Sequence, residues 1–169
     1  LQGWRREPSR LQLIARAAGL NPLLAAFGID AGALSQPSAH EAELVYASTG
    51  ALASGAAAML EISAPGFDAA YTGGLAMPGD TPLSLAGVLP LKANDLSEAV
   101  AIAGLPVARG TAGVSVDGRL DVKRDGAGWS IASRQLKAGQ SHLSGVARLE
   151  PKAGAPATLS ADIKADTIS

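Results

Sequence analysis

The sequence predicts a mainly β chain with short α-helices, arranged as a curved antiparallel sheet that forms an open groove or half-barrel. Three observations predict this class. From about residue 41 onward, apolar residues alternate with small or polar ones, which is the period of a half-buried strand. The chain of 169 residues contains 20 Gly and 10 Pro, which is typical of many turns. Finally, part of the sequence repeats.

The repeat links two segments that lie about 72 residues apart. The run Leu91–Ser97 (LKANDLS) returns as Ile163–Ser169 (IKADTIS), and Tyr71-Thr72-Gly73 returns as Leu143-Ser144-Gly145. Such a period indicates a stacked or laterally extended architecture of two repeats. Because the second copy is cut short, we expect the sequence to be a section of a longer repeat protein. The expected organisation is a helical N-terminal segment and loop at 1–40, a first β repeat at 41–94, a junction helix at 95–106 and a truncated second β repeat at 107–169.

The N-terminal segment predicts a helix. Leu11, Ile14, Ala15 and Ala18 recur at helical spacing, and Ser9 is a candidate N-cap. Two further short helices are expected. One covers 23–27, and the other covers 96–103, where Asn94 or Asp95 would cap its first turn.

About eight strands are expected after residue 41. The clearest runs from 114 to 123, where even positions are apolar or Gly and odd positions are polar or charged. This pattern gives a strand one apolar face and one polar face that is exposed to solvent. The tetrapeptide Asp125–Gly128 (DGAG) predicts a tight hairpin turn rather than a phosphate loop, because a strand follows it. Short turns between neighbouring strands indicate an antiparallel meander.

Composition narrows the possible functions. The net charge is −1 and the pI is about 6.1, which disfavours a nucleic-acid partner, because such partners need a clustered basic face. The chain has no Cys, so no thiolate metal site or Cys nucleophile is expected. We expect no cofactor, no metal and no enzymatic activity. His40 and His142 lack ligand spacing, and Ser141 cannot easily pair with His142, because neighbours in a strand face opposite ways.

The phrases 82–87 and 93–96, followed by 143–145 and 159–166, resemble the AsmA-like family of bacterial envelope proteins. The likeness is one of alternation rather than a catalytic signature. It implies a periplasmic protein that is anchored in the inner membrane by a segment outside this chain. It further implies a long sheet with an apolar trough that carries phospholipid acyl chains between the inner and outer membranes or supports outer-membrane assembly. Other envelope proteins are possible partners.

An apolar sheet face must be covered by helices, by another sheet or by a ligand. The same alternation is expected for an ordinary sandwich core, so both interpretations stay open. A second function is a structural repeat module that binds other proteins through its sheet edges. The candidate trough residues are Leu60, Ile62, Phe67, Tyr71, Leu75, Leu85, Leu89, Val116, Leu120, Val122, Trp129, Ile131, Leu143, Leu149, Leu159 and Ile163.

Overall fold

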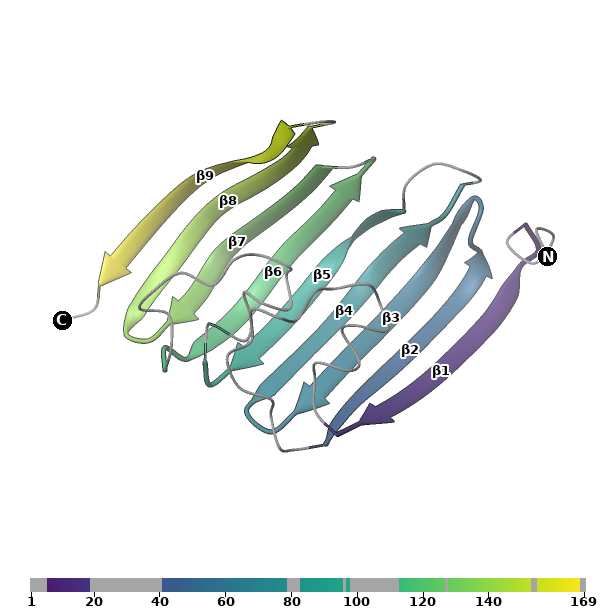
Figure 1. Ribbon diagram of the computed structural model, residues 1–169, viewed down its shortest axis with the longest axis horizontal. Coiled ribbons are helices and arrows are strands. Elements are labelled where there is room, and N and C mark those ends of the chain that lie inside the picture. Colours follow the sequence, from purple (N-terminus) through teal and green to yellow (C-terminus); the bar gives the residue numbers. More distant parts are fainter. Residues whose placement is uncertain are drawn as a thin grey trace.

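The computed structural model describes residues 6–18, 41–78, 83–95, 97, 113–126, 128–152 and 155–167, with the side chains of 151–157 and 167 left out. These residues form one sheet of nine strands in the order β1 to β9, and every neighbouring pair is antiparallel (Figure 1). The strands are β1 (Ser9–Ala17), β2 (Ala42–Ala51), β3 (Gly55–Ala64), β4 (Phe67–Ala76), β5 (Ser84–Ala93), β6 (Val116–Asp125), β7 (Gly128–Ala138), β8 (Ser141–Lys152) and β9 (Ala155–Thr167).

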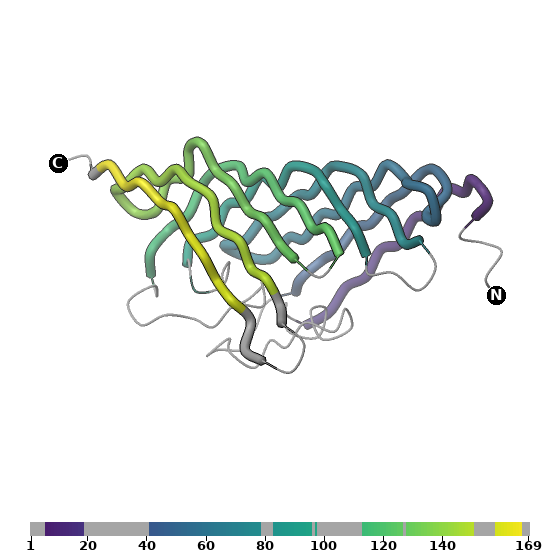
Figure 2. The backbone as a smooth tube through the Cα atoms, turned by 90° about the horizontal axis from the view of Figure 1, so that it is seen from above, coloured from purple at the N-terminus to yellow at the C-terminus, as the bar shows by residue number. Residues whose placement is uncertain are grey.

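The mainly β class and the antiparallel meander are confirmed. Each strand pairs with its neighbours in sequence, and β1 and β9 form the two edges, so the sheet is open among the described residues. Figure 2 shows the strands side by side along the sheet, with β8 and β9 slanting away at the C-terminal end. The predicted hairpin is also present. Asp125 pairs with Gly128, and Gly126 has a φ of 59°, a left-handed value that Gly adopts without steric cost.

The predicted N-terminal helix is wrong, because this segment is strand β1. It pairs with β2 over its whole length, from Ser9 opposite Gly50 to Ala17 opposite Ala42. In this short run, apolar residues fit a period of two as well as the helical period. Pairing decides between them, because an adjacent strand satisfies the backbone groups of β1. This strand accounts for the ninth member of the sheet.

The other two expected helices cannot be compared in the same way. The segment 23–27 lies outside the described residues, and so does 96–103 apart from Ser97. Asp95 does make the bond expected of an N-cap, because its Oδ1 accepts from the Ser97 backbone N–H at 2.8 Å and from the Ser97 hydroxyl at 2.6 Å.

Pairing register divides the side chains between two faces, because residues directly opposite each other in a sheet point the same way. One face, here called the apolar face, contains Leu44 of β2, Ile62 of β3 and Ala69 of β4. The other, the polar face, contains Glu43, Ser63 and Asp68 of the same strands. An extra residue at 134–135 of β7 shifts its pairing with both neighbours. This bulge returns Leu136 to the apolar face, opposite Gly118 and Leu143.

The best-buried part of the molecule lies on the apolar face near one end of β2 to β5. Phe67 and Ala93 are 1% exposed and Leu44 is 2% exposed. Phe67 and Ala93 are direct cross-strand partners, and both belong to a single hydrophobic cluster with Leu44 and Ala69. Burial of such apolar side chains holds these strands together at roughly 1.5–3 kcal/mol for each large one.

The two copies of the repeated sequence lie on different strands of the sheet, and their cross-strand partners differ. The two Tyr71-type segments lie on β4 and β8, and the Leu91 and Ile163 segments begin on β5 and β9. However, Gly73 faces Gly87, whereas its counterpart Gly145 faces Ile163. The copies therefore lie four strands apart in the sheet, and their pairing registers differ.

Candidate ligand-binding face

All sixteen candidate trough residues lie on the apolar face. Direct partners show this across the sheet: Leu60 faces Tyr46, Leu120 faces Leu89, and Ile131 faces Val122. The register continues to the far edge, where Leu149 faces Leu159. The register thus places these residues on one side of strands β3 to β9. Their placement on one face of the sheet does not by itself show whether they form a core or bind a ligand.

Exposure varies strongly over this one face. Phe67, Val116 and Val122 are buried, at 1%, 1% and 8% exposure. In contrast, Leu159 and Ile163 on β9 are both 59% exposed. The opposite edge behaves similarly, because Leu11 and Leu13 on β1 are 44% and 46% exposed. Four of the five large apolar side chains that are exposed among the described residues lie on this face, and Ile14 lies on the other. A group of exposed apolar side chains on one face marks a surface suited to a hydrophobic ligand or partner.

Gly73 and Gly87 are direct cross-strand partners on the apolar face, at a place where no larger side chain fits. A Cβ on Gly73 would lie 2.4 Å from the Ala86 carbonyl oxygen and 2.6 Å from the Tyr71 hydroxyl oxygen. A Cβ on Gly87 would lie 2.8 Å from the Tyr71 ring. The ring therefore lies over the glycines, and its hydroxyl donates to the Gly74 carbonyl at 2.7 Å. Burial raises the pKa of Tyr71, which a backbone hydrogen bond with Ala86 partly offsets. The sequence analysis did not detect this arrangement.

Arg124 is a second residue that the sequence analysis missed. It follows Val122 on the apolar face of β6, between Leu85 of β5 and Trp129 of β7. Its guanidinium carbon lies 5.1 Å from the centre of the Trp129 ring, within cation–π range. Its Nε is buried and has no hydrogen-bond partner. The even-position pattern of 116–122 pointed to this placement, because it continues to 124.

The composition of the apolar face makes Arg124 stand out. Outside the β7 bulge, every other paired strand position that the structure places on this face is apolar, Gly, Ser or Thr. No carboxylate occupies any of these described positions. Among the described residues, both cross-strand neighbours of Arg124 on this face, Leu85 and Trp129, are therefore uncharged.

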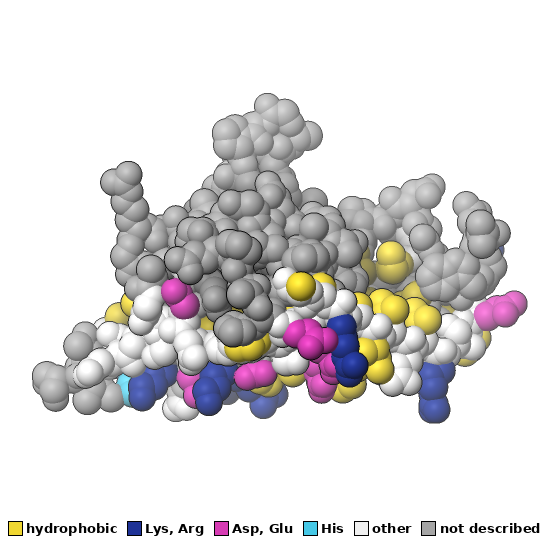
Figure 3. Space-filling model, turned by 60° about the horizontal axis from the view of Figure 1, so that its bottom comes forward, with side chains coloured by type: hydrophobic (Ala, Val, Ile, Leu, Met, Phe, Trp, Pro, Cys, Tyr) yellow, Lys and Arg dark blue, Asp and Glu magenta, His cyan; other side chains and the backbone are white. Residues whose placement is uncertain are grey.

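The polar face carries an almost continuous row of ionisable residues. Each member is the direct cross-strand partner of the next, and opposite charges alternate over much of the row. Figure 3 shows charged side chains gathered along this side of the sheet. Such neighbours contribute roughly 0.2–1 kcal/mol per pair. From β1 to β9, the row consists of Arg16, Glu43, Ser63, Asp68, Lys92, Asp117, Lys137, His142 and Asp166.

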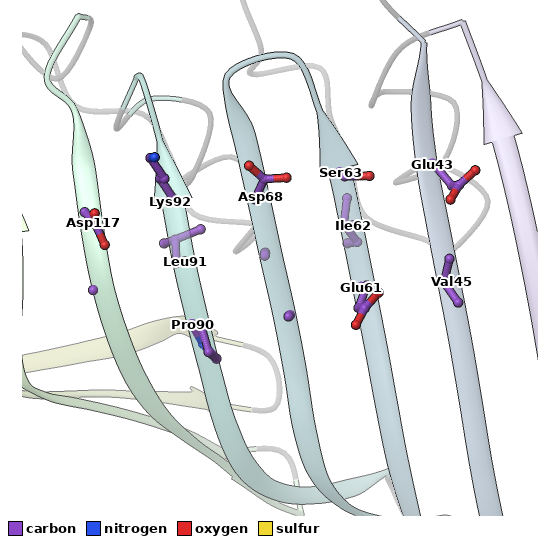
Figure 4. A pocket seen from close by; sticks show the side chains of 13 residues that line it. Glu43, Val45, Glu61, Ile62, Ser63, Asp68, Pro90, Leu91, Lys92 and Asp117 are labelled. Carbon is purple, nitrogen blue, oxygen red and sulfur yellow. The ribbon is translucent and has the colours of Figure 1, made fainter.

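Part of this row borders a shallow depression of about 300 Å³. Figure 4 shows Glu43, Ser63, Asp68, Lys92 and Asp117 at nearly one level on the adjacent strands β2 to β6. The closest ion pair in the row joins Arg16 Nε and Glu43 Oε2 at 2.5 Å. The Arg16 side chain is exposed and the Glu43 side chain is half-buried, and solvent weakens their attraction. The charged residues line this depression together with the uncharged Val45, Ala70 and Pro90, so its surface is mixed.

Other candidate chemistry is sparse. Ser141 pairs with Ala138 on the apolar face, whereas His142 pairs with Lys137 on the polar face, so these neighbours point in opposite directions as the sequence predicted. Over the part of the chain that the structure describes, no group of three His, Asp or Glu residues could hold a metal ion. His40 lies outside that part.

Comparisons with protein-family models, with curated proteins and with solved structures find no match for this chain. A search of the described helices finds none that is both long and apolar enough to cross a membrane.

Proposed function

We propose that this chain is a non-catalytic section of an AsmA-like envelope protein whose apolar face binds phospholipid acyl chains. The observation that carries the proposal is the exposure of Leu159 and Ile163, two large apolar side chains on the face that elsewhere forms the core. Removing apolar surface from water stabilises a complex by about 0.8 kcal/mol per buried CH₂ group. An acyl chain supplies many such groups without requiring a specific polar partner.

The proposal includes an open groove and a two-repeat sheet, with β2–β5 and β6–β9 as the repeating units. Strands of the first set begin at 42, 55, 67 and 84, and those of the second begin at 116, 128, 141 and 155. The differences, 74, 73, 74 and 71 residues, are close to the sequence repeat. A face continued through successive units would keep the burial of an acyl chain nearly constant, so lipid would slide without entering a deep trap.

In this proposal the protein acts in the periplasm and is held at the inner membrane by a segment outside this chain. It would conduct lipid between the two membranes or support outer-membrane assembly. These parts rest on the sequence resemblance to the AsmA-like family.

Photo-crosslinking in cells tests the acyl-chain proposal. A probe at Ile163 lies on the apolar face, and a probe at the adjacent Lys164 lies on the polar face, because Lys164 pairs with Ser144. Lipid adducts at Ile163 but not at Lys164 are expected. Adducts to protein at Ile163, without lipid, would contradict the proposal.

One observation favours the second function, which is protein binding through sheet edges. In the described sheet, β1 and β9 each pair on one side only. An unpaired strand edge offers backbone donors and acceptors for strand addition. Protein adducts at probes along β9, together with an absence of lipid adducts on the apolar face, would support this function instead.

A further inference from the structure

The apolar face contains one charged residue at a place where a ligand headgroup could be bound. Arg124 lies next to the last residue of β6, close to the Gly126 turn, and therefore at the margin of the apolar face. A buried donor such as its Nε costs roughly 1–3 kcal/mol when it has no acceptor. A guanidinium group binds phosphate through paired N–H donors in a planar fork.

A row of apolar side chains leads away from Arg124 across the sheet. Arg124 pairs with Trp129, Trp129 with Leu149, and Leu149 with Leu159. Exposure rises along the row, from the half-buried Trp129 and Leu149 to Leu159 at 59%. Ile163 lies further along the same edge strand and is equally exposed. The row thus joins a cationic end to an open apolar surface.

The length of this row suits one acyl chain. Neighbouring strands lie about 4.8 Å apart, so the three steps from β6 to β9 cover about 14 Å. The hydrocarbon core of a bilayer is about 30 Å thick, and one chain accounts for about half of that. A headgroup held at Arg124 would therefore allow its acyl chain to reach the exposed side chains of β9.

We propose that Arg124 binds the phosphate of an anionic phospholipid whose acyl chain lies over Trp129, Leu149 and Leu159. This inference rests on the proposed function and gives the bound lipid an orientation. Trp129 would contact both parts of the ligand, because its ring lies beside the guanidinium and within the apolar row. On the polar face, Lys92 lies between Asp68 and Asp117 and Arg148 lies between Ser130 and Ser160, so neither of these cations adjoins an apolar row.

Fluorescence of Trp129 provides a direct test. The chain has two Trp residues, Trp4 and Trp129, so Trp4→Phe leaves Trp129 as the only strong emitter. The probe is monoacyl phosphatidylglycerol with a dibrominated chain, kept below its critical micelle concentration. Bromine quenches Trp129 when the chain lies against the ring. We expect saturable quenching, and about tenfold weaker binding after Arg124→Gln, because a charge-assisted hydrogen bond is lost.

The matched control is Arg148→Gln. Arg148 lies on the polar face, opposite Ser130 and Ser160, and its replacement makes the same change in charge. It should leave the affinity within about twofold. Arg124→Lys keeps the charge without the planar fork and should bind with intermediate affinity. If Arg124→Gln fails to fold, as judged by circular dichroism, the Lys variant decides, and wild-type affinity for it would overturn the guanidinium assignment.

The other outcomes show whether this inference fails alone or together with the proposed function. Equal quenching in Arg124→Gln and the parent would overturn the headgroup assignment while leaving acyl-chain binding intact. Displacement of the lipid by millimolar inorganic phosphate alone would assign Arg124 to a free anion and overturn the inference. Equal affinity for the zwitterionic phosphatidylcholine analogue would overturn the preference for anionic lipid. Absence of quenching in every variant would contradict the proposed function as well.

Discussion

Two regions of the apolar face differ in the exposure of their side chains. Over β2 to β5, Leu44, Phe67 and Ala93 are at most 2% exposed and behave as a core. On β9, Leu159 and Ile163 point to the same side of the same sheet but are 59% exposed. The alternating sequence pattern is alike in both regions. The comparison teaches that one pattern can accompany full burial in one region and exposure in another, and we propose that the exposed region binds a ligand.

The largest expected effect comes from truncating a buried side chain in the first region. Phe67→Ala should lower the free energy of unfolding by about 3–5 kcal/mol, because it leaves a cavity in the core. Leu159→Ala, the control on β9, should change it by no more than about 0.5 kcal/mol. Urea unfolding measures both. Similar losses for the two variants would remove the distinction between the regions.

The glycine pair permits a matched test of close packing. Gly73→Ala should cost about 1–3 kcal/mol, because the new methyl would overlap the Ala86 carbonyl and the Tyr71 hydroxyl. At the adjacent Gly74, the nearest atom to a Cβ is 3.9 Å away, so Gly74→Ala should be neutral or stabilising by up to about 1 kcal/mol. Thermal unfolding of the two variants gives the comparison. A neutral Gly73→Ala would show that Tyr71 does not rest on the sheet.

The polar face is predicted to aid stability through its charged row. Lys92 lies between Asp68 and Asp117, so Lys92→Glu replaces two attractions by two repulsions. We expect a loss of about 1–2 kcal/mol at low salt, and a smaller loss in 1 M salt, where charges are screened within about 3 Å. Arg148→Glu is the control, because both of its cross-strand neighbours are Ser. A loss that is the same for both variants would contradict a role for the row.

The smallest expected effect concerns acid. Burial acts to raise the pKa of Asp95, but hydrogen bonds from Ser97 and from the Gly113 backbone outweigh it and lower the pKa below its ordinary value of 3.8. A lowered pKa stabilises the fold above the unfolded value, and this stabilisation is lost as pH falls through the folded value. Asp95→Asn should therefore reduce the acid sensitivity of unfolding between neutral pH and about pH 2. An Asp162→Asn control that changes it equally would argue against a special role for Asp95.

The sequence was most informative where periodicity was long and regular. It placed all sixteen candidate residues on one face and predicted the Asp125–Gly128 hairpin. It failed at β1, because nine residues with Leu11, Leu13 and Ile14 fit either a helix or a strand, and only pairing with β2 decides. It also missed the contact of Tyr71 with Gly73 and Gly87, which depends on the register between β4 and β5. The alternation of apolar and polar residues shows which face a residue lies on, but not which residue of the next strand it pairs with.

Exposure was the other property that the sequence could not provide. Val122 and Ile163 have the same local pattern, yet one is 8% exposed and the other 59%. Their difference depends on position in the sheet, since β6 is internal and β9 is an edge. Arg124 was accessible in principle, because it continues the even positions of β6. Its significance required the structure, which shows that its neighbours on both sides are apolar.

The central claim is that the apolar face of β9 binds lipid rather than forming part of the core. The most direct test is the paired variant Leu159→Asp and Ile163→Asp, studied for both unfolding free energy and lipid bound in native mass spectrometry. We predict that the unfolding free energy changes by less than about 1 kcal/mol, because both side chains are already largely in water, and that bound phospholipid is lost. A loss of several kcal/mol in stability, or lipid retained at the wild-type level, would contradict the account.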